Sequence, residues 1–201
     1  MSLTLTSLGG AGTVTGSRHL LEYKGQRLLI DCGLFQGYKA LRERNWAAFP
    51  IDPKSIDAIV LTHAHIDHSG YLPKLVREGY RGPVYCSSAT KDLCEILLRD
   101  SAYINERDAE RANRYRYTKH KHAEPLYTVA DAELALKQLA PIDFHQDVHL
   151  AIGADIHLRR AGHILGASTV EVRWGGKTIV FSGDLGRYGD PFMFDPEPVT
   201  A

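Results

Sequence analysis

The sequence predicts a layered α/β domain. In the first two thirds of the chain, short apolar runs with the length of buried strands alternate with longer segments whose apolar residues recur at helical spacing. From residue 148 onward the chain is instead rich in short strand patterns. Strands that alternate with helices are typical of a sheet covered by helices. With 201 residues, 44% of them hydrophobic, the chain suits one domain with a sizeable core.

The N-terminal part is expected to be mainly strands. Residues 3–8 alternate between apolar and polar side chains, which predicts a half-buried strand that runs into the glycine-rich loop 9–12. That loop lacks the Lys-Ser/Thr of a P-loop and the full GxGxxG pattern, so we interpret it as a tight turn. Residues 18–23 and 27–31 predict a hairpin, and residues 34–53 predict a helix or an irregular segment.

Three helices are expected in the middle of the chain. The first covers residues 69–79 and has Pro73 in its first turn, where proline is tolerated. The second begins at Ser88 or Thr90 and follows a short strand. The third runs over residues 128–139 and opens with a capping-box pattern.

The final third is expected to form an antiparallel sheet. A two-residue glycine turn at 175–176 predicts a hairpin between the last two strands. The predicted strands are residues 148–150, 155–159, 169–174 and 178–181.

The composition narrows the class of protein. Lys plus Arg and Asp plus Glu each number 24, so overall charge gives no sign of a polyanionic partner. The three cysteines lack a CxxC spacing, which favours reduced thiols in a cytoplasmic protein. No apolar run approaches membrane-spanning length, and residues 1–12 lack the basic start of a signal peptide. We therefore expect a cytoplasmic protein with no membrane partner.

One segment is locally basic. Residues 107–122 contain six Arg or Lys residues interleaved with Tyr and His. Such a segment could contact nucleic acid, because basic groups neutralise phosphates and aromatic rings stack on bases. A solvated helix end followed by a mobile loop explains the same pattern equally well.

Three histidines and one aspartate are concentrated in residues 62–68, which read THAHIDH. They follow residues 56–61, an apolar run that predicts a buried strand, and they precede the first predicted helix. Imidazole nitrogens and carboxylate oxygens bind zinc and similar divalent metals. A strand-to-helix turn of this kind is a common place for functional residues.

The spacing within this stretch suggests two metals. His63 and His65 lie two residues apart on extended backbone and point to the same side, so they could bind one metal. Asp67 and His68 lie past the bend and could face a second metal. Two ligands for each metal are too few, since zinc usually takes about four. Further ligands must therefore come from distant parts of the chain.

Two later residues are the best candidates for these ligands. His163 and Asp184 both lie in glycine-flanked loops that follow predicted strands, as expected of ligands presented from one edge of a sheet. A carboxylate such as Asp184 has two oxygens and could bridge two metals. Asp31 also ends a predicted strand; it is a turn former unless it lies near the histidines, where it could orient a metal-bound imidazole. We interpret the remaining histidines as ordinary core or surface residues: His19, His120, His122, His145, His149 and His157.

The motif HxHxDH at 63–68 resembles the signature of the metallo-β-lactamase superfamily, and the chain is most similar to its β-CASP branch of RNA-processing nucleases, which includes the cleavage and polyadenylation nuclease. The resemblance spans nearly the whole chain. It rests on segments that occur in the same order: Gly16-Ser17, residues 31–37 (DCGLFQG), residues 62–73, residues 161–168 (AGHILGAS) and residues 181–186 (FSGDLG).

This resemblance implies an αββα sandwich with two zinc ions at one edge and hydrolysis of RNA phosphodiester bonds by metal-activated water. The implied ligands are His63, His65 and His163 for one zinc, Asp67 and His68 for the other, and Asp184 for both. The implied catalytic carboxylates are Asp67, which helps to orient the water, and Asp31, which supports the ligands.

One departure from the family pattern shapes the expected domain organisation. In the β-CASP branch a second domain is inserted after the motif that contains Asp184, and a later segment supplies a last histidine for the second zinc. We expect residues 1–190 to be the N-terminal part of a metallo-β-lactamase domain and residues 191–201 to begin the connection to the insertion. By itself the chain should then have an incomplete second metal site and weak or no nuclease activity.

Two other functions fit parts of the pattern. A thioesterase or lactonase of the same superfamily fits the metal motif but not the neighbouring motifs. A non-catalytic RNA-processing scaffold fits the fold, although the intact ligand set speaks against it. Besides RNA, a second copy of the chain or a processing-complex partner could bind.

Overall fold

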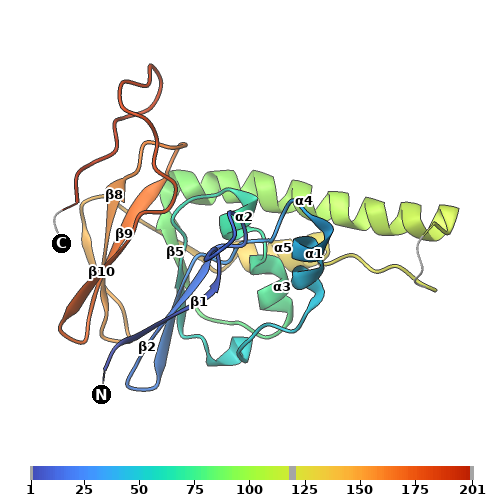
Figure 1. Cartoon of the computed structure of the whole chain (residues 1–201), viewed down its shortest axis with the longest axis horizontal. Helices are drawn as coiled ribbons and strands as arrows, with labels where there is room; N and C mark the ends of the chain where they lie inside the picture. The colour runs from blue at the N-terminus through green and yellow to red at the C-terminus, as the bar shows by residue number, and fades with distance from the viewer. Residues whose placement is uncertain (1, 118–120, 200–201) are drawn as a thin grey trace.

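The computed structural model describes residues 2–117 and 121–199, which form two packed sheets with helices on one side (Figure 1). The six-stranded sheet contains, in spatial order, β1 (Thr4–Gly9), β2 (Arg18–Tyr23), β3 (Gln26–Ile30), β4 (Ala58–Val60), β5 (Val84–Ser87) and β6 (Leu139–Ile142). The four-stranded sheet contains β10 (Lys177–Phe181), β9 (Ser168–Trp174), β8 (Asp155–Arg160) and β7 (Asp147–His149).

The helices connect strands of the larger sheet and cover its outer face (Figure 1). Short 3₁₀ turns occupy Arg44–Trp46 and Pro53–Ser55. The α-helices are α1 (Lys39–Glu43), α2 (Ile66–Ser69), α3 (Leu72–Arg77), α4 (Ser88–Tyr115) and α5 (Val129–Leu136). The described residues thus form three layers, helices, sheet and sheet, of the predicted αββα sandwich.

Strand direction explains how distant residues reach one edge of the larger sheet. Strands β1 to β3 pair in antiparallel fashion, whereas β3 to β6 pair in parallel. Because β3 and β4 run in the same direction, the residues that follow them, Asp31 and Thr62, emerge side by side. The Asp31 backbone N–H donates to Val60 O over 2.9 Å, and the Thr62 backbone N–H donates to the Asp31 carboxylate over 2.8 Å.

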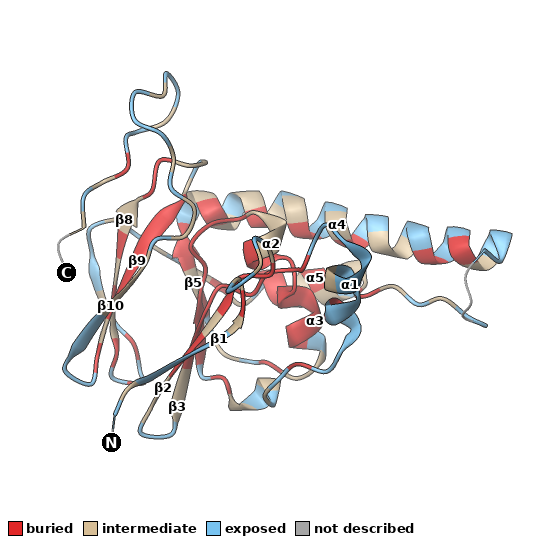
Figure 2. Ribbon diagram, viewed as in Figure 1, coloured by how far each residue is buried: buried red, intermediate tan, exposed pale blue. Residues whose placement is uncertain are grey.

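Two apolar layers hold the sheets and helices together. Figure 2 shows the buried residues along the strands and on the helices beside them. One layer lies between the sheets, where inward side chains of β2, β3 and β4 meet those of β8 and β9. The other lies between the larger sheet and α3, α4 and α5. Strands β3 and β4 supply side chains to both layers, which explains their continuous apolar sequences.

The structure confirms most predicted strands and the second and third helices, with four corrections. The predicted helix 69–79 is shorter and corresponds to α3 (Leu72–Arg77), because Gly70 and Tyr71 form a turn; α2 is a separate helical turn that begins within the histidine-rich stretch. The third helix ends at Leu136 rather than Leu139, and Leu139–Ile142 is strand β6, which the sequence prediction missed. Pro141 sits at this edge of the sheet, where proline is tolerated.

The fourth correction concerns the burial of strand β1, which is more exposed than predicted. It was predicted to be half-buried, but its first four residues are exposed, because β1 lies at an edge and its apolar side chains have few partners. Leu5 is 52% exposed. The alternating pattern therefore predicted the strand correctly but not its burial.

Helix α4 extends further than its apolar spacing predicted and contains the first part of the basic segment. Acidic residues are interleaved there, and Arg107 pairs with Glu110 at 3.1 Å. The rest of the segment includes residues 118–120, which lie outside the described residues. Among the described helices, none is both long and apolar enough to cross a membrane.

Candidate metal centre

The histidine-rich turn begins where β4 ends and passes directly into α2. Thr62, His63 and Ala64 are buried against the sheet edge. His65 is the N-cap of α2, with extended backbone (φ −55°, ψ 146°), so the chain turns between His65 and Asp67. The predicted change of direction inside the motif is therefore present, and it places Asp67 and His68 on a helical turn.

Four of the predicted ligands converge on one point. Nε2 of His63 lies 3.1 Å from Nδ1 of His65, and Nε2 of His163 lies 3.2 Å from the same Nδ1. The Asp184 Oδ2 atom lies 3.8 Å from His63 Nε2 and 3.6 Å from His163 Nε2. All four potential donor atoms lie within 4.8 Å of one another, a spacing that one metal ion could fill.

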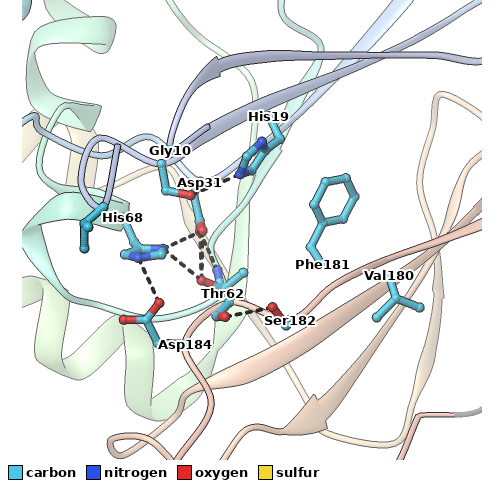
Figure 3. Close-up of a pocket in the computed structure, with 12 residues that line it drawn as sticks. Gly10, His19, Asp31, Thr62, His68, Val180, Phe181, Ser182 and Asp184 are labelled. Carbon is cyan, nitrogen blue, oxygen red and sulfur yellow. Dashed lines mark hydrogen bonds and ion pairs between the residues drawn. The ribbon is translucent and has the colours of Figure 1, made fainter. Parts of the chain in front are cut away.

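The other two predicted ligands form a second half of the centre. His68 Nε2 lies 3.4 Å from Asp184 Oδ1 and 3.9 Å from Asp67 Oδ2. Asp184 therefore directs one carboxylate oxygen to each half, and Figure 3 shows it facing His68. All six predicted residues are brought together, but their role as ligands stays a prediction.

A buried carboxylate holds His68 in place from the other side. Asp31 is 1% exposed, and its Oδ2 lies 2.7 Å from His68 Nδ1 (Figure 3). An ionised carboxylate only accepts hydrogen bonds, so His68 Nδ1 carries the proton and Nε2 offers a lone pair to the centre. Asp31 thus lies near the histidines, as its predicted role in orienting an imidazole required.

Thr62 extends this network, and the sequence prediction assigned it no role. Its hydroxyl lies 2.9 Å from Asp31 Oδ2 and 3.0 Å from His63 Nδ1. The hydroxyl proton is donated to the carboxylate, so the Thr62 oxygen accepts from His63 Nδ1–H. His63 Nε2 is then free to bind a metal. One signal in the sequence could have indicated a role for Thr62, namely its position directly before the first histidine.

Glycine allows the second half of the centre to pack against the loop after β3. A Cβ atom on Gly33 would lie 1.6 Å from the backbone oxygen of Asp67. Hydrogen bonds from Ser17 N to Asp67 O (2.9 Å) and from Cys32 N to His68 O (2.7 Å) fasten the same turn. Close packing against the turn that carries Asp67 and His68 therefore explains the glycine at position 33 in segment 31–37, which is part of the family resemblance.

The lowered pKa values of His63 and His65 suit the binding of a cation by these two residues. Burial, with smaller effects from neighbouring histidines, lowers the pKa of His63 to about 2, and burial also lowers the pKa of His65. For His68, burial opposes protonation, but the hydrogen bond and charge of Asp31 outweigh it and raise the pKa. The neutral nitrogen atoms of His63 and His65, which converge with the carboxylate of Asp184, form a donor set that suits a divalent metal.

A cavity of about 310 Å³ opens beside His68 and Asp184. His19 was interpreted as an ordinary core or surface residue, yet it lines this cavity together with Asp31 (Figure 3). Its ring nitrogens contact the hydroxyls of Ser7 and Ser17 at 3.2 and 3.3 Å. No spacing in the sequence marked His19, because β2 places it there only in the folded sheet.

The fold agrees with the comparison to known families. Residues 12–200 match the family described as the metallo-β-lactamase superfamily. The chain belongs to the metallo-β-lactamase superfamily. Its histidine and aspartate cluster supports the use of divalent metal by this metallo-β-lactamase domain.

Curated relatives refine this assignment. The chain is 42% identical over 195 residues to a ribonuclease of Thermus thermophilus. This alignment covers 96% of this chain and 40% of the relative. It is 34% identical over 199 residues to the transcription termination factor FttA of Methanosarcina mazei (96% of this chain, 28% of the relative). It is 32% identical over 193 residues to cleavage and polyadenylation specificity factor subunit 3-I of Arabidopsis thaliana (94% and 25%). These names confirm the predicted resemblance to the β-CASP branch. The chain spans 40% or less of these relatives.

Solved structures confirm the fold. A mutant form of a metallo-β-lactamase from Cronobacter sakazakii aligns with a TM-score of 0.57 and 23% identity, over 93% of this chain and 64% of that one. The metallo-β-lactamase fold protein YhfI from Bacillus subtilis aligns with a TM-score of 0.55 and 17% identity, over 90% and 61%. At these identities the similarity concerns the fold alone.

Proposed function

We propose that this chain carries the two-zinc centre of a hydrolase that cleaves RNA phosphodiester bonds. The observation that carries the proposal is the position of Asp184, with Oδ2 on the side of His63 and His163 and Oδ1 on the side of His68. A carboxylate in this position suits a bridge between two metals. The chain covers only part of its relatives, so this activity is proposed for the whole protein.

Each ligand is assigned by the half of the centre that it faces. His63, His65 and His163, with one oxygen of Asp184, would hold the first zinc. Asp67 and His68, with the other oxygen, would hold the second. Asp31 does not reach a metal; it orients His68 through the 2.7 Å hydrogen bond.

The chemistry divides between the metals and the protein. Bound zinc ions supply an activated water nucleophile and stabilise negative charge on the phosphoryl oxygens. Asp67 would orient the water and would also be a ligand of the second metal. Asp31 and Thr62 keep His68 and His63 in the tautomers that leave each Nε2 unprotonated. The 310 Å³ cavity beside this centre gives space for substrate.

RNA is the substrate that the relatives favour. One is named a ribonuclease, and another is a subunit of a cleavage and polyadenylation factor. A thioesterase or lactonase has no such support among these relatives. The convergence of all six predicted side chains also argues for a catalytic protein rather than a scaffold.

The test combines metal content with RNA cleavage in the full-length protein. We expect about two zinc ions per chain, cleavage of a labelled single-stranded RNA that chelation abolishes, and recovery when zinc is returned. Asp184→Asn should lose at least one zinc and lower the cleavage rate by about 10²-fold or more. Asp155→Asn, at the far end of β8, is the matched control.

Three results would overturn this proposal. Chelation that leaves RNA cleavage unchanged would remove the metals from the reaction. Fewer than one zinc per full-length chain, without activity, would favour a scaffold. Hydrolysis of thioesters or lactones in place of RNA would favour the small-molecule enzyme.

A further inference from the structure

The segment that follows Asp184 folds back onto the loop that carries His163. This segment, residues 185–197, is here called the strap, and residues 161–167 are called the His163 loop. Near its start, the strap's Gly186 N–H donates to Ala161 O over 2.8 Å. The contact is backbone against backbone, since a Cβ on Gly186 would lie 1.9 Å from Gly162 O. The two loops that present His163 and Asp184 are thus joined directly.

Glu197 closes the other end of the strap. Its backbone N–H donates to Arg160 O over 2.9 Å, and its carboxylate accepts from the Arg160 backbone N–H over 3.1 Å. The Arg160 guanidinium donates to the same carboxylate over 3.0 Å, and His145 Nε2 lies 2.8 Å from it. Arg160 is the last residue of β8, three positions before His163. Glu197, at the end of the strap, therefore contacts both the last residue of β8 and His145.

Two further features show that this contact is specific. His145 has a left-handed backbone (φ +63°), which is unfavourable for a residue with a side chain and has to be held by its surroundings. The Arg160 guanidinium also lies over the rings of Phe144 and Phe194, at 5.2 and 5.1 Å from their centroids. Burial opposes ionisation of Glu197, but the hydrogen bonds from His145 and Arg160 outweigh it and lower its pKa.

The His163 loop is not tightly packed against the strap, so contacts with other elements are needed to fix its position. A cavity of about 190 Å³ lies between the loop and the strap, lined by Phe144, Arg160, Met193 and Phe194 together with loop residues. On the opposite side the loop is fastened to the start of α4, where the Ser87 and Thr90 hydroxyls donate to Gly166 O over 2.7 and 3.0 Å. The loop is thus held at one end by α4 and at the other by the strap.

We propose that Glu197, with Arg160 and His145, is a positioning clamp that sets the distance between His163 and Asp184 and thereby the metal affinity of the three-histidine site. The inference rests on the proposed metal role of these residues. Glu197 contacts no predicted ligand, so it acts through the loop and the strap. Removal of the clamp should leave the fold intact and loosen one half of the centre.

The test is a metal titration of full-length protein and does not depend on catalysis. The probe is Co²⁺, whose visible absorption reports the number and geometry of its ligands, with affinity measured by competition against a chromophoric chelator. Glu197→Gln should weaken Co²⁺ binding about 10-fold, the lower end of the effect known for residues that orient metal ligands, and should alter the visible spectrum. Arg160→Lys, which keeps a positive charge near Glu197, should give a smaller loss.

The matched control is Asp155→Asn. Asp155 forms a similar exposed pair, with its Oδ1 atom 2.8 Å from His149 Nδ1, at the opposite end of the same strand. This variant should bind Co²⁺ like the wild type. Circular dichroism and thermal unfolding of every variant establish that it is folded at the temperature of the titration.

The outcomes separate the clamp from the proposed function. If the wild type fails to bind Co²⁺, the metal centre itself is refuted. If the wild type binds and folded Glu197→Gln binds with the same affinity and spectrum, the clamp is refuted. Equal losses in Glu197→Gln and Asp155→Asn would also refute it, because the effect would then reflect the stability of the sheet rather than His163.

Discussion

Asp31 Oδ2 lies 2.7 Å from Nδ1 of His68, although the two residues are 37 positions apart in the chain. Asp31 follows β3, and His68 ends the turn that follows the parallel neighbour β4. The carboxylate decides which imidazole nitrogen faces the centre. This single contact links sheet topology to the chemistry of the second half of the site.

Replacement of Asp31 by asparagine should therefore affect metal binding at the half that contains Asp67 and His68. The neutral amide no longer favours the Nδ1–H tautomer through its charge, so we expect about 10-fold to 100-fold weaker binding of the metal proposed for this half. Isothermal titration of full-length protein with zinc measures the number of binding events and the affinity of each. Asp57→Asn, which removes a carboxylate that accepts from Arg27 N at 2.7 Å, is a control at the opposite end of these strands. Unchanged binding in Asp31→Asn would contradict the orienting role.

Thr62→Val should cost both stability and metal affinity. Valine keeps the shape but removes the hydroxyl that links Asp31 to His63 at 2.9 and 3.0 Å. The loss of buried hydrogen bonds should lower the free energy of unfolding by about 1–3 kcal/mol. Thr62→Ser retains the hydroxyl and should recover most of the metal affinity. Urea unfolding and zinc titration of both variants give the comparison; equal zinc affinity in Val and Ser variants would show that the hydroxyl does not orient His63.

Gly33→Ala should displace the turn that carries Asp67. The added Cβ would lie 1.6 Å from Asp67 O, a distance that backbone atoms cannot tolerate. Gly153→Ala is the control for the backbone strain that alanine causes without a clash, because Gly153 has a left-handed backbone (φ +76°) with open space around it. Gly153→Ala should cost about 1 kcal/mol in free energy of unfolding. Gly33→Ala should cost several times more or prevent folding, as thermal unfolding and soluble yield would show.

Acid should destabilise the metal-free protein through His63. Burial lowers the folded-state pKa of His63 to about 2, whereas the unfolded chain has an ordinary value of 6.5. Between these values only the unfolded state binds the proton, so the free energy of unfolding falls as pH decreases below about 6.5. The slope from this residue is at most about 1.4 kcal/mol per pH unit.

The contribution of His63 can be isolated by comparison with His63→Gln in the presence of a chelator. His68 acts in the opposite sense, because its raised pKa contributes stability that is lost as pH rises through the folded value. Glutamine does not titrate, so His63→Gln should lose less stability than the wild type between pH 7 and pH 5 in urea unfolding. Parallel stability curves for the two proteins would contradict the lowered pKa of His63.

The sequence by itself determined the alternation of strands and helices, the family and the group of six candidate ligands. Their signals are local: periodicity along one element, glycine at turns, and three histidines with an aspartate within residues 63–68. It did not determine where α5 ends or that residues 139–142 form β6. Such a short segment becomes a strand because β5 offers it an edge with which to pair.

Only the tertiary structure decided which atoms meet. The parallel pairing of β3 and β4 places Asp31 beside Thr62 and His68, and the return of the chain through β8, β9 and β10 brings His163 and Asp184 to the same edge. Thr62, His19 and Glu197 contact residues 12 to 52 positions away in the chain: Asp31, Ser7 and His145, respectively. No local pattern encodes such contacts, because they arise from sheet register and from the close approach of loops.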